Sequence, residues 1–339
     1  RRMTTAVRER IAARRGEPAA VIRSGRGPGG FVLQLNAFGD VTPEIESALQ
    51  ETADYYAEQF DDDVTVVLDA FFNPGFFGLA IPEVMAMDYT VVRQALIDDA
   101  DADDTIQALL PAGSLPVRRS RGGAVTQETE LLLTAANLRA LGFDPGPAPD
   151  GAIEVSSIVD FDPSDGIQGQ PGTFEEYSGL DILVHEVGHA LGFLSPFDVS
   201  SGIPTTLYLY RFALPQDNPS DAGEFAAFPR ALYNETGSGE QIFDDLAREV
   251  PFSVGQFGSP SHWYETVLPD AADRIGLMEP SLFPLENGFP DYFSDHDRAA
   301  FDAIGWDRAG GEPCPADLAE PFGVLDLADV QAFVGAFTS

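Results

Sequence analysis

The sequence predicts a mixed α+β fold, for three reasons. Before residue 178, segments with the alternating apolar pattern of strands lie between segments with helical spacing. Two later segments, 178–192 and 294–304, combine helical spacing with a capping residue at the start. The chain has 339 residues, 44% of them hydrophobic, and is long enough to bury a sizeable core. Strands and helices that mix in this way are typical of the α+β class.

Residues 1–28 are rich in Arg, Ala and Gly, so we expect an N-terminal arm that is disordered or propeptide-like. A helix over 43–60 should follow a strand over 31–35, because Thr42 offers a capping hydroxyl and Pro43 fits the first helical turn. Further along, the pattern predicts a strand at 64–68, a helix at 89–97, a polar linker at 118–123, a helix at 131–141 ended by Gly142, and a strand at 153–159.

The two later helices begin in the same way. Ser178 and Ser294 each stand three residues before an aspartate, which is the spacing of a capping box, and Gly192 can end the first helix in a left-handed conformation. A Gly-Gly-Glu-Pro stretch after residue 309 is typical of a linker. We therefore expect an N-terminal subdomain of 29–193, a second subdomain of 194–308, and a short C-terminal unit of 309–339.

The charge balance excludes some partners. The chain has 55 acidic residues against 19 basic ones, a net charge of −36, and every basic residue is arginine. Such a surface repels phosphate groups, so nucleic acid is not an expected partner. No stretch has the ~20 apolar residues of a membrane helix, so no membrane span is expected. The one cysteine, Cys314, has no partner for a disulfide within the chain.

Residues 185–189 have the sequence His-Glu-Val-Gly-His. Positions four apart lie on one face of a helix, so His185 and His189 would bind one metal ion, each at the ~2.0–2.1 Å of a zinc–nitrogen bond. Glu186 would lie beside the metal, where a carboxylate can take a proton from an activated water. The chain has only four histidines, so this spacing would rarely arise by chance. The motif predicts a zinc site in which Glu186 is the catalytic base.

Catalytic zinc usually has three protein ligands and one open position. Several residues are candidates for the third ligand. His262 offers another imidazole, Asp198 is a nearby carboxylate, and a downstream glutamate such as Glu235 or Glu265 would give a different ligand set.

The segment from His185 to Phe193, together with Ser261-His262-Trp263 and Met278, resembles the leishmanolysin branch of the metzincin metalloproteases. The resemblance implies that His262 is the third zinc ligand, reached after a long insertion, because Ser195 stands where other metzincins have a histidine. It also implies a twisted sheet over the zinc helix, and a hydrophobic turn beneath the metal formed by Met278. More broadly, residues 31–307 are similar to secreted bacterial proteins with the same H-E-x-x-H pattern.

These features predict a secreted or cell-surface, extracellular zinc endopeptidase that acts on proteins or peptides. Glu186 would remove a proton from the activated water and later return it to the leaving amine. By the resemblance, the strand at 153–159 would pair with an extended substrate.

The C-terminal segments 314–318 and 323–330 resemble half of a dockerin-like calcium module, in which an acidic loop leads into a helix. Asp317, Asp326 and Asp329 are the candidate calcium ligands, and the helix would form a short helical tail. The implied partner is a cohesin-like or cell-surface protein.

Two other functions fit the same residues. A non-catalytic extracellular adhesion or scaffold protein would bind zinc or calcium and be anchored by the C-terminal unit. A zinc hydrolase that acts on a non-protein amide would use the same catalytic groups. Glu186 favours an enzyme, because a purely structural metal site needs no carboxylate beside it.

Overall fold

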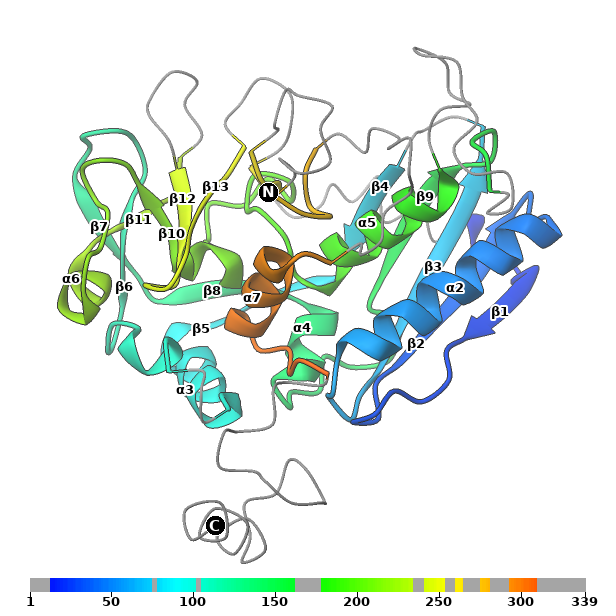
Figure 1. Ribbon diagram of the computed structural model, residues 1–339, viewed down its shortest axis with the longest axis horizontal. Coiled ribbons are helices and arrows are strands. Elements are labelled where there is room, and N and C mark those ends of the chain that lie inside the picture. Colours follow the sequence, from blue (N-terminus) through cyan, green and yellow to red (C-terminus); the bar gives the residue numbers. More distant parts are fainter. Residues whose placement is uncertain are drawn as a thin grey trace, which may run out of the picture.

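The computed structural model describes residues 13–74, 78–101, 105–161, 178–233, 241–253, 260–264, 275–280 and 293–309. These residues form several sheets and helices in mixed order, which confirms the α+β class. Figure 1 shows a five-stranded sheet with α2 at one end of the molecule and two three-stranded sheets at the other, with α7 between them.

The first part of the chain supplies β1 (Ala20–Arg23), β2 (Val32–Gly39), α2 (Pro43–Gln59), β3 (Thr65–Asn73), β4 (Gly78–Pro82), β5 (Val84–Asp88), α3 (Tyr89–Asp99), η1 (Gln107–Leu109), β6 (Leu115–Arg118), β7 (Val125–Glu128), β8 (Glu130–Thr134), α4 (Ala135–Ala140) and β9 (Gly151–Ser156). The second part supplies α5 (Gly179–Leu191), η3 (Thr206–Tyr210), β10 (Arg211–Ala213), α6 (Ala222–Ala227), β11 (Arg230–Ala231), β12 (Gln241–Asp244), β13 (Glu249–Pro251) and α7 (Asp295–Ala303).

The five-stranded sheet has the order β1-β2-β3-β9-β4. Strands β2, β3 and β9 are parallel, whereas β1 and β4 run antiparallel to their neighbours and form the two edges. The side chains of Leu35, Leu68 and Ile153 project from one face into the main core. Helices α2 and α5 pack against that face and against each other, where the Tyr56 hydroxyl donates to the Val184 carbonyl at 2.6 Å. The sheet thus supports α5 from behind.

The predicted helix over 43–60 is confirmed as α2, and its N-cap is Thr42, whose hydroxyl accepts from the backbone N–H of Ile45. The helix expected at 89–97 is α3, and the strand expected at 153–159 begins two residues earlier as β9. Helix α7 starts with the expected capping box, since the side chains of Ser294 and Asp297 each accept from the other's backbone N–H.

The helix expected at 131–141 is wrong in its first part. Leu131, Leu132 and Leu133 belong to β8, which pairs antiparallel with β5, and only α4 is helical. Leucine favours helices in isolation, but here pairing with β5 supplies the backbone hydrogen bonds and buries all three side chains. Thr134 then caps α4 through its hydroxyl.

The expected N-terminal arm of 1–28 is not all a tail. Residues Ala20–Arg23 form β1, which is paired with β2 from Ala37 to Gln34. Val21 remains exposed while Ile22 packs against the core, so the alternating pattern of a strand is present but short.

Among the helices in the described parts of the chain, none combines the length and the apolar character needed to cross a bilayer.

Asp62, between α2 and β3, is a buried carboxyl group. Burial, together with the neighbouring charges of Asp307 and Asp99, raises its pKa from the ordinary value of 3.8 to about 8. The folded protein therefore binds this proton more tightly than the unfolded chain, and the corresponding stability is lost as the pH rises from about 4 through 8. Asp62→Asn should be more stable than the wild type at pH 9, by at least about 1 kcal/mol, and similar to it at pH 4.

Denaturant unfolding at the two pH values measures this difference. Asp63→Asn is the matched control, because the Asp63 side chain is exposed and forms only a surface ion pair with Arg26. An equal gain at pH 4 and pH 9, or the same gain for Asp63→Asn, would contradict the expectation.

Candidate metal centre

Helix α5 carries two of the three histidines that meet in this structure. Its first turn is capped by the hydroxyl of Ser178, which accepts from the N–H of Asp181 at 3.3 Å, and it ends at Gly192 with a φ of 133°. All thirteen residues of the helix are buried. His185 and His189 lie one turn apart, so both imidazoles leave the helix on one side, as the spacing predicted.

His262 lies far along the chain but reaches the same point. Its Nε2 atom is 3.2 Å from Nε2 of His185 and 3.1 Å from Nε2 of His189, and the latter two atoms are 3.1 Å apart. Trp263 forms a bridge with Phe252, and the Ser253 N–H donates to the His262 carbonyl at 2.8 Å. These contacts hold the His262 segment against the residues that follow β13, and in this position its imidazole reaches α5.

The hydrogen bonds of the two helical histidines fix their tautomers. Nδ1 of His185 lies 2.9 Å from the Leu277 carbonyl, and Nδ1 of His189 lies 2.7 Å from the Phe193 carbonyl. A carbonyl oxygen can only accept, so each Nδ1 carries the proton and each Nε2 presents a lone pair. Burial lowers the pKa of both imidazoles to about 3, so both are neutral near pH 7. Two lone pairs at this distance repel unless a cation lies between them.

The spacing of the three nitrogens fits zinc. Three ligands at ~2.05 Å from one ion, at tetrahedral angles, lie roughly 3.3 Å apart. The observed separations of 3.1–3.2 Å are close to that value. Across the described residues, this is the group of histidine and acidic side chains whose ligand atoms converge closely enough to hold a metal ion. A set of three imidazoles with an open fourth position would also suit other divalent transition metals.

Glu186 lies on α5 beside the histidines but is not one of the converging ligands. Burial raises its pKa to about 8, a backbone hydrogen bond from Ala80 lowers it, and the charge of Asp198 raises it. The carboxyl group also lies against Gly78, where a Cβ atom would come within 2.5 Å of its Oε1. Strand β4 is therefore in direct contact with the predicted base.

The edge strand near the site is β4, which corrects the expectation for residues 153–159. Strand β9 is paired on both sides, parallel with β3 and antiparallel with β4, so its backbone has no free edge for a substrate. Strand β4 was not predicted from the sequence, because Gly78-Leu79-Ala80-Ile81-Pro82 contains a glycine and a proline that weaken a strand pattern. Both residues are compatible with an edge position.

A turn that contains Met278 lies under α5. Met278 is fully buried, and a Cβ atom on Gly188 would come within 2.7 Å of its sulfur, so the missing side chain of Gly188 lets the turn approach the helix. The preceding Leu277 supplies the carbonyl that accepts from His185. The turn thus packs below the histidines and orients one of them.

Asp297, on α7, connects the parts of the site that come from distant segments. Its carboxylate accepts from Trp263 Nε1 at 2.8 Å, from the Leu277 N–H at 2.8 Å, from the Met278 N–H at 3.3 Å, and from the N–H and hydroxyl of Ser294, both at 2.9 Å. Burial raises its pKa, and these donors oppose the rise. The sequence showed Asp297 only as a capping residue, and its additional partners are tertiary.

The alternative ligands do not join the histidines. Asp198 accepts from the Ser195 N–H at 3.0 Å and lies outside the converging group, while Glu235 and Glu265 lie outside the described residues. Ser195, at the position of the missing metzincin histidine, is buried and hydrogen-bonded to the Tyr208 hydroxyl at 2.9 Å. The candidate calcium ligands Asp317, Asp326 and Asp329, and the expected helical tail, lie outside the described residues.

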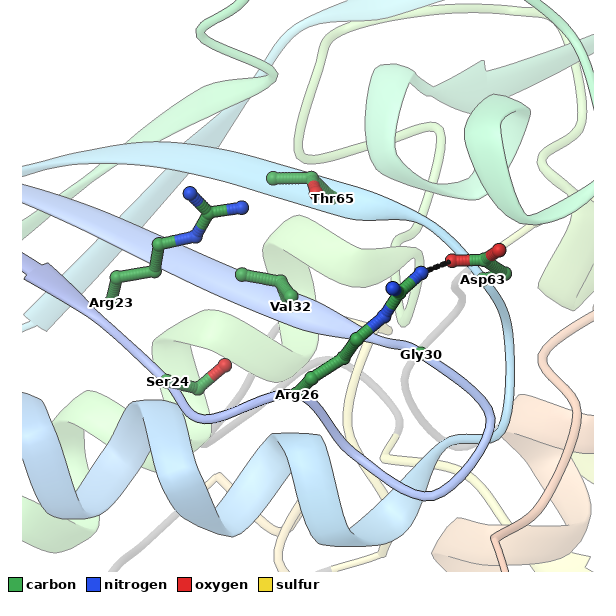
Figure 2. Close-up of a pocket in the computed structure, with 7 residues that line it drawn as sticks. All are labelled: Arg23, Ser24, Arg26, Gly30, Val32, Asp63 and Thr65. Atoms are coloured by element: carbon green, nitrogen blue, oxygen red, sulfur yellow. Dashed lines mark hydrogen bonds and ion pairs between the residues drawn. The ribbon is translucent and has the colours of Figure 1, made fainter.

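A separate surface pocket of about 330 Å³ lies where β1 ends and β2 and β3 begin (Figure 2). Arg23 and Arg26 line it, and Arg26 pairs with the exposed carboxylate of Asp63. The lining includes no residue of α5 or of the segments around His262 and Met278, so this pocket is not part of the metal centre.

Comparisons of the chain with protein-family models, with curated proteins and with solved structures gave no match. The basis for assigning a function is therefore the chemistry of the site.

Proposed function

We propose that the protein is an extracellular zinc-dependent endopeptidase related in design to the leishmanolysin branch of the metzincins. The observation that carries the proposal is the convergence of three imidazole nitrogens at 3.1–3.2 Å beside a buried carboxyl group. In this proposal His185, His189 and His262 hold the metal and leave its fourth position open. The buried turn at Met278 and the long insertion before His262 agree with the sequence resemblance.

Zinc, when bound, would supply a Lewis acid that polarises the scissile carbonyl and makes a water molecule more acidic. Glu186 takes the proton of that water and passes it to the leaving amine. Its pKa of about 8 reflects burial, and a cation beside it would lower that value, so that the carboxylate form is available near neutral pH. The Ala80 N–H fixes the carboxyl group in place on the side of β4.

We propose that the backbone of β4 aligns the peptide substrate. The strand is an edge of the five-stranded sheet, and its Gly78 and Ala80 face α5 and contact Glu186. An extended peptide that adds to this edge would lie along the metal centre, with main-chain hydrogen bonds rather than a deep pocket providing much of the affinity. This mode of binding favours peptides over compact amides.

The first test measures metal and peptide cleavage together. The purified full chain should contain about one equivalent of zinc and cleave members of a quenched fluorescent peptide library, and 1,10-phenanthroline should abolish cleavage until zinc is restored. His262→Gln should weaken zinc affinity by about a hundredfold or more. His296→Gln is the matched control, because His296 lies outside the converging group.

The outcomes separate the alternatives. Zinc without cleavage of any peptide would favour a binding or scaffold protein, and turnover restricted to non-peptide amides would favour a different hydrolase. Absence of a stoichiometric transition metal, or equal zinc affinity in the two histidine variants, would refute the metal site itself.

Gly78→Val tests the contact between β4 and Glu186. The added Cβ would come within 2.5 Å of Glu186 Oε1 and 2.8 Å of Ile182 Cγ2, so the carboxyl group must shift. We expect kcat/KM to fall by about tenfold to a hundredfold while the zinc content stays unchanged, because a displaced base is costly and the ligands are untouched. Leu79→Val is the control, since Leu79 is on the opposite face of the strand and partly exposed. Equal activity of the two variants would show that the contact is unimportant.

A further inference from the structure

The face of the five-stranded sheet opposite α2 and α5 carries two buried carboxylates. Asp69 on β3 and Glu154 on β9 are each only 2% exposed. The two strands are adjacent and parallel, with Asp69 opposite Ala152 and Phe71 opposite Glu154, so the carboxylates lie on the same face one step apart along the strands. Carboxylates this deeply buried are costly to keep unless cations or donors compensate them.

Both carboxylates contact a residue of the sheet and a residue of the N-terminal arm. Asn36 donates to Asp69 at 3.0 Å, and Asn73 donates to Glu154 at 2.6 Å. The consecutive arginines of the arm contact the two carboxylates: Arg15 Nε lies 2.6 Å from Asp69 Oδ2, and Arg14 Nη1 lies 2.7 Å from Glu154 Oε1. The arrangement matches two adjacent guanidinium groups to two carboxylates on neighbouring strands.

We propose that Asp69 and Glu154 form a binding site for two consecutive arginines, and that the arm of the same chain, through Arg14 and Arg15, is the resident ligand. The site is independent of the metal centre and of the proposed peptidase activity. The two arginine side chains are 41% and 39% exposed, so their outer parts stay accessible to solvent while their guanidinium groups engage nearly buried acids. A segment with the same Arg-Arg sequence, supplied in trans, would compete for the same carboxylates.

The ion pairs explain how the arm is held where it enters the sheet. Ala19 donates its N–H to the Ala37 carbonyl at 2.8 Å, and β1 begins at the next residue. Between Arg15 and Ala19 the chain is Gly-Glu-Pro, in which the glycine and the proline disfavour both helix and strand. The two guanidinium groups therefore fix the arm just before β1, on the back of the sheet. Glu154, which binds Arg14, is opposite Leu79 of β4 in the sheet. The arm therefore lies on the face of the sheet opposite α5, close to the edge strand that contacts Glu186.

Hydrogen–deuterium exchange of the full chain tests the resident ligand. In Arg14→Gln/Arg15→Gln, the amide of Ala19, which donates to the Ala37 carbonyl, should exchange about tenfold to a hundredfold faster, because two charge-assisted contacts are lost, while α2 and α5 exchange as before. Asp69→Asn/Glu154→Gln should show the same change. Arg26→Gln is the matched control, since Arg26 pairs only with the exposed Asp63.

Competition in trans tests the binding site. In a Glu186→Gln background, a capped peptide of residues 11–19 should speed exchange of the Ala19 amide, and millimolar concentration is needed because the peptide must compete with a tethered arm. The same peptide with Gln-Gln in place of Arg-Arg should have no effect. The arm variant lies outside the core, so its result stands even if the double carboxylate variant fails to fold. Exchange equal to that of Arg26→Gln, or equal displacement by the Gln-Gln peptide, would overturn the proposal.

Discussion

Glu186→Gln is expected to keep the metal and lose the reaction. The three ligand atoms are all imidazole nitrogens, so replacing the carboxylate leaves the zinc affinity essentially unchanged. The glutamine oxygen can still accept from the Ala80 N–H, so the geometry at β4 is kept. What is lost is a group that can take a proton from water and return it, which lowers kcat by about a hundredfold to ten-thousandfold. Zinc content and cleavage of a library-selected peptide, measured on the same samples, give both quantities.

The pH dependence gives a second readout of the same residue. The base is active as a carboxylate, so the rate should rise with pH through the pKa of Glu186 in the metal-loaded protein. Burial is the main reason that this pKa is raised to about 8 without metal, and a neighbouring cation lowers it, so the acidic limb should lie below pH 8. Glu186→Gln should lose this limb.

The control is Glu58→Gln, the same substitution at an exposed position of α2. It should match the wild type in zinc content, rate and pH profile. Undiminished cleavage by Glu186→Gln would end the proposed mechanism, whereas loss of zinc in that variant would mean that the carboxylate binds the metal instead.

Asp297→Ala is expected to have the largest effect on stability. Its carboxylate is fully buried and accepts hydrogen bonds from the indole of Trp263, from the Met278 turn and from Ser294. Removing it leaves buried N–H groups without an acceptor, at a cost of about 1–3 kcal/mol for each such group. We expect the free energy of unfolding to fall by about 3 kcal/mol or more, measured by denaturant unfolding of the metal-free protein.

The same substitution should weaken zinc binding. Asp297 holds the N–H of Leu277, whose carbonyl accepts from His185, and it holds the indole of Trp263, the neighbour of His262. Metal ligands whose supporting hydrogen bonds are lost typically bind about tenfold to a hundredfold more weakly, and competition with a chromophoric chelator measures this. Asp295→Ala is the control, because Asp295 is exposed in the first turn of the same helix. If the two variants are equally stable and bind zinc equally, Asp297 does not support the site.

The parts of the site that the sequence predicted are those set by local geometry. In any α-helix, two side chains four positions apart lie on the same face, whatever surrounds the helix. The positions of His185, His189 and the neighbouring Glu186 could therefore be predicted from the motif and from the capping residues of the helix. Helices α2 and α7 were predicted for the same reason, because Thr42 and Ser294 specify the first turns through hydrogen bonds a few residues away.

Other elements depended on partners that are distant in the chain. Leu131–Leu133 forms a strand because β5 pairs with it, and the same leucines would suit a helix elsewhere. Ala20–Arg23 becomes β1 because β2 offers a free edge. Strand β4 was not predicted. Its glycine, Gly78, is favoured by a close contact with Glu186, and these two residues lie more than a hundred positions apart in the chain.

The sequence by itself therefore determined the α+β class, helix α5 and the placement of two histidines and a carboxylate on it, because hydrogen bonds and side-chain spacing within one helix need no other segment. Only the tertiary structure decided that His262 rather than Asp198 meets them, that β4 is the strand beside Glu186, and that Asp297 connects the turn at Met278 to Trp263. These contacts join residues that are separated by loops of no fixed geometry, and their positions are set by the packing of whole elements around one core.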